Sequence, residues 1–287
     1  MLPCRNAEDV DAAAARMFGP ASAFSGVSHV TALWAAPGGA LVTLAIGPHS
    51  PKSAHDFFSL QYSRARADAI VVTGKILRDE PSLRYEFQGE SKDALASWRT
   101  QNVSDEPPML VILTSGRGLD GSHPAFHGWA RPVVLTGADA RLGELPAHVS
   151  VVRHSAPSIE SAVKWLREDQ GARIVSIEAG PSTTGELYEA GLVDELRLSV
   201  FRGPYVPPQA RAQGSAGTDA GTDAGTDAGT DAGTDAGTDA GTDAGRSRGW
   251  ASELRETTLV ERFLPSAAPY VADEPSGPWT FQRYTPR

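Results

Sequence analysis

Residues 173–191 combine features that are typical of a phosphate-binding turn. The stretch reads RIVSIEAGPSTTGELYEAG: a short apolar run, a Gly-Pro turn, small hydroxyl residues and a helical segment. Gly180 permits close approach of the backbone to a ligand, and Ser182, Thr183 and Thr184 lie where the first turn of a helix exposes unpaired N–H groups. The stretch predicts an anion site, with an ordinary capped strand-to-helix turn as the alternative.

Glu178 adds a carboxylate to the same stretch. It lies at the predicted carboxyl end of a strand, which is the edge of an open α/β sheet at which ligands bind. A surface salt bridge is its alternative role. Glu178 is therefore a candidate to accept hydrogen bonds from a ligand.

A second stretch, residues 67–83, reads ADAIVVTGKILRDEPSL. Thr73 and Gly74 form a permissive turn after a β-branched run, and Asp79 follows one short turn later. The alternative is that the acidic end of this stretch only closes a helix. Its position predicts a second set of ligand contacts at the same sheet edge.

Short apolar runs alternate with helical segments around these two stretches. The runs predict strands at 40–46, 69–73, 109–114, 132–136, 149–153, 173–178 and 195–201. Amphipathic patterns and capping residues, Ser158 among them, predict helices at 6–18, 54–66, 158–168 and 183–190. Residues 254–263 and 279–284 predict an antiparallel strand pair. This order predicts an α/β fold with a mostly parallel central sheet and helices on both faces.

The unit AGTD recurs seven times between Ala216 and Asp243. A segment without apolar side chains larger than alanine cannot offset its chain entropy, so we expect it to be disordered. The expected organisation is an N-terminal helical extension at 1–36, one domain formed by 37–206 and 250–287, and the repeat insertion at 207–249. The residues after the repeat are too few for a core of their own.

The net charge and the cysteine count limit the kinds of molecule that the protein is expected to bind. The formal net charge is −9, and the seven aspartates of the repeat account for most of it. A nearly neutral remainder offers no electrostatic reason for binding nucleic acid or a membrane. The single cysteine excludes an internal disulfide and a cysteine-rich zinc site, and no export signal is evident, so we expect a cytoplasmic protein that acts on small molecules.

Taken together, the two stretches resemble one family, the C-terminal reductase domain of the bifunctional riboflavin-biosynthesis deaminase/reductase, which has a dihydrofolate-reductase-like fold. Its motifs read approximately ADA-strand-GxxTVxxDxPxL and EGGPxxxGxLLxxGLVDEL. Here they stand as ADAIVVTGKILRDEPSL and EAGPSTTGELYEAGLVDEL. The resemblance covers about residues 40–205 and, more weakly, the closing WTFQRY segment.

The resemblance implies NADPH-dependent hydride transfer to the ribosyl C1 of a 5-amino-6-ribosylaminouracil phosphate, a phosphorylated small molecule. Cofactor contacts would fall on Lys75, Asp79, Ser115, Gly180, Pro181, Ser182, Thr183, Thr184 and Gly185. Substrate contacts would fall on Arg64, Leu83 and Glu178, and Arg64 could pair with a substrate phosphate. The resemblance assigns no catalytic side chain, and it implies a homodimer by analogy.

Departures from the family pattern keep a second hypothesis open. The segment AIGPHSPKSAHD is shorter than its counterpart and lacks a Ser-x-Asp-Gly stretch, and Glu86 replaces an arginine, with Arg84 close by. A deaminase zinc site cannot be built with one cysteine, and His123 and His127 read as a loop pair, so no metal is expected. The alternative to an enzyme is a degenerate, non-catalytic member that acts as a dinucleotide-binding or assembly module.

Overall fold

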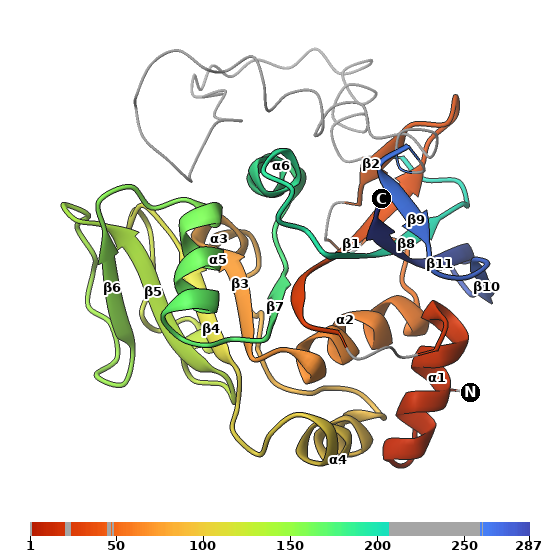
Figure 1. Ribbon diagram of the computed structural model, residues 1–287, viewed down its shortest axis with the longest axis horizontal. Helices are drawn as coiled ribbons and strands as arrows, with labels where there is room; N and C mark the ends of the chain where they lie inside the picture. The colour runs from red at the N-terminus through yellow and green to blue at the C-terminus, as the bar shows by residue number, and fades with distance from the viewer. Residues whose placement is uncertain (1, 21–23, 45–46, 48, 207–258, 260) are drawn as a thin grey trace, which may run out of the picture.

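One large sheet organises the molecule (Figure 1). The computed structural model describes residues 2–20, 24–44, 47, 49–206, 259 and 261–287. In these residues the sheet has eleven strands in the order β10-β11-β8-β1-β7-β3-β4-β5-β6, with β2 beside β1 and β9 beside β11. The strands are β1 (Gly26–Ala35), β2 (Leu41–Thr43), β3 (Ala69–Thr73), β4 (Met109–Leu113), β5 (Arg131–Gly137), β6 (Ser150–His154), β7 (Ile174–Ile177), β8 (Glu195–Phe201), β9 (Phe263–Pro265), β10 (Tyr270–Glu274) and β11 (Gly277–Pro286).

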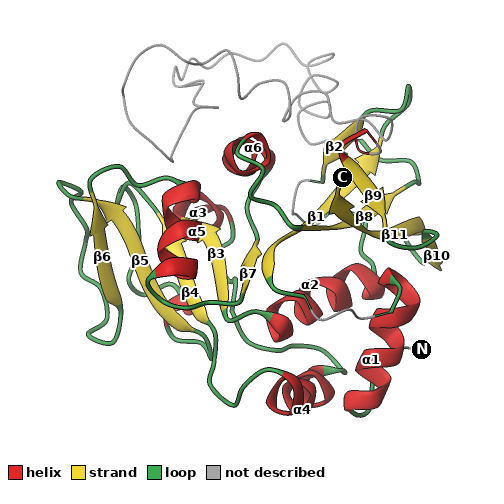
Figure 2. Cartoon of the chain, viewed as in Figure 1, coloured by secondary structure: helices red, strands yellow, loops and turns green. Residues whose placement is uncertain are grey.

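Helices cover both faces of the sheet, as Figure 2 shows. They are α1 (Ala7–Phe18), α2 (Ala54–Arg66), α3 (Gly74–Asp79), α4 (Lys92–Asn102), α5 (Ile159–Glu168) and α6 (Pro181–Glu189), with a 3₁₀ turn at Pro124–Phe126. The strands from β8 through β1, β7, β3, β4 and β5 to β6 are parallel neighbours. In contrast, β11 pairs antiparallel with β8 on one side and with β10 on the other. The predicted fold class is therefore confirmed.

Local capping explains why several helices begin where the sequence predicts. The Ser53 side chain accepts hydrogen bonds from the backbone of His55 and Asp56, so α2 begins at Ala54. Ser158 and Ser161 cap the start of α5 reciprocally. Such caps satisfy N–H groups that have no partner inside the helix. The N-cap predicted at Ser158 is confirmed.

The N-terminal region departs from the prediction. Residues 1–36 are not only a helical extension, because β1 lies between β7 and β8 in the middle of the sheet. Where the run expected at 40–46 is described, it forms the short strand β2, which pairs with β1, and Val42 on it is exposed. Ser28, His29 and Thr31 interrupt the apolar pattern of β1, and this is why a central strand escaped the sequence prediction.

The C-terminal region completes the same sheet. The segment predicted at 279–284 lies within β11, which pairs antiparallel with β8. The prediction of a strand at 254–263 is wrong for the residues of this range that the structure describes. Leu259, Glu261 and Arg262 are helical, and β9 begins only at Phe263. The partner of β11 on its other side is β10, which the sequence did not predict. The AGTD repeat lies outside the described residues.

Apolar packing fills three clusters around the sheet. One cluster joins α5 and α6 to the sheet, and Ile159, Leu187 and Val175 are members. A second packs α1, α2 and α4 against β11, and a third lies over β3, β4 and β5. Burial of this kind stabilises the fold by roughly 25 cal/mol per Å² of apolar surface. The clusters pack against the strands whose ends carry the candidate site.

Candidate active site

Three adjacent strands bring the two predicted stretches together at one edge of the sheet. β3 lies between β7 and β4, with Val71 opposite Ile177 and Thr73 opposite Leu113. All three strands are parallel, so their carboxyl ends share an edge. The segments that follow them are α3, the loop at 114–116 and the turn into α6. Figure 1 shows α6 above the end of β7.

The turn after β3 is packed closely against the end of β4. A Cβ atom at Gly74 would lie 2.6 Å from Thr114 Oγ1, so only glycine fits at this position without movement. The Thr114 hydroxyl in turn accepts a hydrogen bond from the backbone of Gly116. Thr73 caps α3 by accepting from Ile76 N. These contacts give the edge a defined shape, with the partly buried Ser115 between the two turns.

Gly180 caps the N-terminus of α6 and leaves room above the backbone. Its φ is −71°, an ordinary value, and a Cβ built on it meets no heavy atom within 4 Å. Its carbonyl oxygen accepts from Thr183 N, Thr184 N and the Thr184 hydroxyl. A group that approaches from outside the protein can therefore reach this backbone. This openness is what a phosphate at a helix N-terminus requires.

The other predicted cofactor residues fall into two groups. Thr184 and Gly185 are buried, and the Thr184 side chain is used to hold the turn, while Thr183 is partly exposed. Lys75 and Asp79 lie on α3 and pair with each other at 2.8 Å, with 65% and 56% of the side chains exposed. This arrangement leaves Lys75, Asp79 and Thr183 accessible at the edge.

The predicted substrate residues Arg64 and Glu178 bind each other. Arg64 Nε and Nη2 donate to the two carboxylate oxygens of Glu178 at 2.9 and 2.7 Å, and both side chains are more than nine-tenths buried. Arg64 Nη1 lies 3.4 Å from the Arg84 carbonyl oxygen, and the guanidinium stacks 4.5 Å from the Tyr85 ring centre. The donors of Arg64 thus orient Glu178. Binding of a substrate phosphate by Arg64 stays a prediction.

Burial shapes the electrostatics around this pair. Burial lowers the pKa of Arg64, but the Glu178 carboxylate outweighs it, and the pKa lies above its ordinary value. Burial also raises the pKa of Tyr85 and of Glu80. Arg64 is therefore permanently charged, and it is the cation that offsets Glu178. Leu83 is partly buried beside these residues and packs against the apolar cluster over β3 and β4.

His29 and Tyr188 form a contact that sequence reasoning missed. His29 lies on β1 next to Ile177, at the end of β7, and its Nδ1 is 2.6 Å from the Tyr188 hydroxyl on α6. Burial lowers the pKa of His29 to about 4, so the ring is neutral at pH 7. The hydrogen bond ties α6 to the sheet directly behind the site. No local pattern marks either residue, because they are 159 positions apart.

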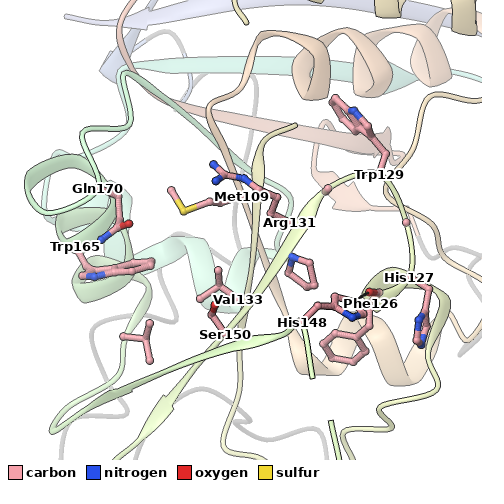
Figure 3. Close-up of a pocket in the computed structure, with 14 residues that line it drawn as sticks. Met109, Phe126, His127, Trp129, Arg131, Val133, His148, Ser150, Trp165 and Gln170 are labelled. Carbon is pink, nitrogen blue, oxygen red and sulfur yellow. Dashed lines mark hydrogen bonds between the residues drawn. The ribbon is translucent and has the colours of Figure 1, made fainter. Parts of the chain in front are cut away.

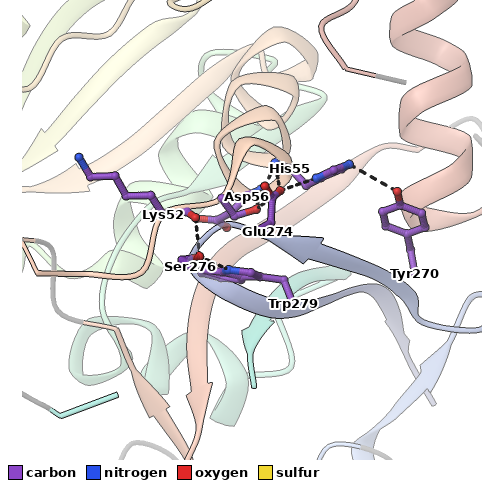
Figure 4. Close-up of polar contacts among 8 residues, drawn as sticks. Lys52, His55, Asp56, Tyr270, Glu274, Ser276 and Trp279 are labelled. Atoms are coloured by element: carbon purple, nitrogen blue, oxygen red, sulfur yellow. Dashed lines mark hydrogen bonds and ion pairs between the residues drawn. The ribbon is translucent and has the colours of Figure 1, made fainter. Parts of the chain in front are cut away.

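A polar network fastens the start of α2 to the β10–β11 hairpin (Figure 4). The Glu274 carboxylate accepts from the Ser53 hydroxyl and bonds to His55 Nδ1. The Ser276 hydroxyl donates to the Lys52 carbonyl oxygen. Hydrogen bonding to His55 and Ser53 outweighs burial and lowers the pKa of Glu274. The network holds the residues just before α2 against the β10–β11 hairpin.

A pocket of about 800 Å³ lies at the opposite edge of the sheet (Figure 3). Met109, Arg131 and Ser150, the first residues of β4, β5 and β6, line it together with Trp129, His148 and Trp165. The amino ends of the strands form this pocket, so it is separate from the candidate site at their carboxyl ends.

Two further properties concern metals and membranes. Among the residues that the structure describes, no group of three His, Cys, Asp or Glu side chains could hold a metal ion. None of the described helices is long and apolar enough to cross a membrane.

The strand order, with helices on both faces of the sheet, is that of a dihydrofolate-reductase-like fold. The model of the RibD C-terminal domain family matches residues 43–204, more than half of the chain. The chain therefore belongs to the RibD C-terminal domain family. No curated protein sequence matches it.

Solved structures with the same fold are distant in sequence. A pyrimidine reductase-like protein from Corynebacterium diphtheriae is 17% identical with a TM-score of 0.58, and the match covers 96% of this chain and 98% of that one. The diaminohydroxyphosphoribosylaminopyrimidine deaminase/5-amino-6-(5-phosphoribosylamino)uracil reductase of Thermotoga maritima is 17% identical with a TM-score of 0.53, covering 92% of this chain and 57% of that one. Acinetobacter baumannii RibD is 16% identical with a TM-score of 0.51, covering 92% and 58%. This chain thus spans little more than half the length of the latter two proteins.

Proposed function

We propose that this protein is an NADPH-dependent reductase that transfers a hydride to the ribosyl C1 of a 5-amino-6-ribosylaminouracil phosphate or a related compound. The observation that carries the proposal is the shared edge of β7, β3 and β4. It gathers the open backbone at Gly180, the accessible residues of α3 and the fixed carboxylate of Glu178. Membership of the RibD C-terminal domain family supports the same reaction class.

The residues present fit a dinucleotide at this edge. The backbone at Gly180 and the N-terminus of α6 would receive the pyrophosphate, with Thr183 beside it, and Lys75 and Asp79 would face the cofactor from α3. Ser115 and the segment from Pro181 to Gly185 complete the proposed contacts. NADPH would supply the hydride, and the protein would supply binding and orientation.

Glu178 is the proposed contact to the reacting sugar or ring. Each carboxylate oxygen has lone pairs beyond the one that Arg64 occupies, so Glu178 can still accept a hydrogen bond from a hydroxyl or a ring N–H. Arg64 acts as its positioning residue, because the bidentate pair allows little rotation of the carboxylate. Arg84, which is exposed beside Tyr85, is the proposed partner of the substrate phosphate.

Titration of the full chain with NADPH and NADH, followed by nicotinamide fluorescence, tests the dinucleotide site. We expect NADPH to bind, and Gly180→Leu to weaken binding at least about tenfold, equal to ~1.4 kcal/mol, because the new side chain fills the open space. Gly180→Ala should have a smaller effect. Gln170→Leu, at the opposite edge, is the matched control. Failure of both dinucleotides to bind the native chain would refute the proposal.

The alternative function is a non-catalytic dinucleotide-binding or assembly module. The short segment before α2, held to the β10–β11 hairpin by Glu274, favours it, because less chain is available to cover a substrate. Incubation with 5-amino-6-(5-phosphoribosylamino)uracil and NADPH separates the two functions. Loss of NADPH absorbance supports the reductase, whereas binding of NADPH without turnover of this or related ribosylated pyrimidines supports the module.

A further inference from the structure

Three buried arginines lie beneath α1 and α2, and two of them, Arg66 and Arg197, bind the same carboxylate. Arg197 on β8 and Arg283 on β11 are directly opposite each other across an antiparallel strand pair. Arg66 reaches the same region from the end of α2. The exposed fractions of these residues are 7% for Arg66, 3% for Arg197 and 9% for Arg283. The cluster is therefore part of the protein interior.

Glu195 is the acid that two of these guanidiniums bind, those of Arg66 and Arg197. Its Oε1 atom accepts from Arg66 Nη1, from Arg197 Nε and from the Ser28 hydroxyl, each at 2.8 Å. Burial raises the pKa of Glu195, but the two arginines outweigh it and lower the pKa to about 2. Glu195 is thus a carboxylate at neutral pH. It neutralises one of the three positive charges.

Aromatic rings enclose the cluster. The Arg197 guanidinium carbon lies 4.7 Å from the centre of the Phe18 ring and 4.9 Å from that of Tyr62. Arg66 lies 5.0 Å from the Phe24 ring centre. Such contacts are attractive for a cation, but they do not cancel its charge. Burial and the neighbouring Arg66 lower the pKa of Arg197 by more than Glu195 raises it.

Two buried N–H donors of the cluster have no hydrogen-bond partner among the residues that the structure describes: Arg197 Nη1 and Arg283 Nε. Arg283 uses Nη2 to donate to the Pro20 carbonyl oxygen. Like charges directly opposite each other on neighbouring strands repel, and a buried unpaired charge costs several kcal/mol. A negatively charged group between these donors would satisfy both and remove the repulsion.

We propose that Arg197 and Arg283 form a buried site for a small inorganic anion such as chloride. The site lies on the α1 and α2 face of β8 and β11, away from the candidate active site. The anion would accept from Arg197 Nη1 and Arg283 Nε and would act as the second counter-charge beside Glu195. A small monoanion suits a site enclosed by side chains and strands. Its role would be to stabilise the packing of α1 on the sheet.

Thermal unfolding of the full chain tests the site. The protein is transferred into sodium gluconate and titrated with sodium chloride or bromide at constant ionic strength. We expect the Tm to rise by about 3 °C and then to saturate. Arg283→Gln should lose this rise and should unfold in gluconate no earlier than the native chain, because the repulsion is gone. Arg202→Gln, an exposed arginine just after β8, is the matched control and should keep the rise.

Two results would overturn the proposal. One is a native chain whose Tm does not respond to halide, and the other is an Arg283→Gln variant that responds as the native chain does. If Arg283→Gln does not fold, crystals of the native chain in sodium bromide provide the second test. An anomalous peak between the Arg197 and Arg283 guanidiniums is expected, and a difference map without that peak would refute the site.

Discussion

Arg64 and Arg66 lie two positions apart at the end of α2, yet they belong to different buried ionic clusters. Two residues along a helix are separated by about 200° around its axis, so the two side chains leave on opposite sides. Arg64 reaches Glu178 after β7, at the candidate active site. Arg66 reaches Glu195 at the start of β8, in the core beneath α1.

The two clusters differ in charge balance. Arg64 and Glu178 form a bidentate one-to-one pair, whereas Glu195 binds both Arg66 and Arg197, and Arg283 lies opposite Arg197 on the neighbouring strand. A balanced pair beside a ligand edge can hold a carboxylate in place for recognition. A buried cluster with more positive than negative groups would instead be stabilised by a further negative charge. The same residue types therefore perform different tasks according to what the fold places around them.

The largest effect is expected from Glu195→Gln. The change removes the carboxylate that the buried Arg66 and Arg197 both bind, and breaking a buried ion pair in this way costs about 3–5 kcal/mol. Urea unfolding should show this loss in the free energy of unfolding. The affinity for NADPH of the molecules that remain folded should be unchanged. A loss below about 1 kcal/mol would mean that the cluster does not depend on Glu195.

Acid should weaken the Glu195 cluster over a defined pH range. The pKa of Glu195 falls from an ordinary value near 4.5 to about 2 on folding, so its contribution is present above pH ~4.5 and is lost as the pH falls to 2. The linked loss is ~3 kcal/mol. Unfolding measured between pH 5 and pH ~2 should show it. A Glu195→Gln variant should lack this part of the acid dependence.

A smaller loss of stability and a large loss of activity are expected from Glu178→Gln. Arg64 keeps the Arg84 carbonyl oxygen and the Tyr85 ring, so we expect the free energy of unfolding to fall by about 2–3 kcal/mol. Turnover of a confirmed substrate should fall with little change in NADPH affinity. Unchanged turnover would remove Glu178 from the site. Arg64→Lys, which cannot form the bidentate pair, should lower turnover in the same direction.

The smallest effect on stability is expected from Lys75→Ala. The Lys75–Asp79 pair is exposed, and pairs of this kind contribute about 0–1 kcal/mol. Its proposed task is to face the cofactor, so fluorescence titration should show weaker NADPH binding. Lys164→Ala, a lysine on α5, is the control. Equal NADPH affinity for the native chain and both variants would show that Lys75 makes no cofactor contact.

Much of the site could be predicted because its signals are local. The turn at Gly180, the segment at 69–79 and the helix at 54–66 are each encoded within a few residues, and the structure places them as predicted. The Arg64–Glu178 contact could not be predicted, because its residues are 114 positions apart. The His29–Tyr188 contact escaped for the same reason, and the polar residues of β1 concealed a central strand.

The sequence by itself determined the order of most helices and strands and the family, and it predicted ligand contacts at two turns. Those properties depend on local conformational preference and on hydrophobic period, which act over a few residues. Only the tertiary structure decided that Glu178 belongs to Arg64, that β1 lies at the centre of the sheet and that Arg197 faces Arg283. The partner of a buried charge depends on which strands become neighbours and which faces they present. Those choices are made when the distant segments of the chain pack together.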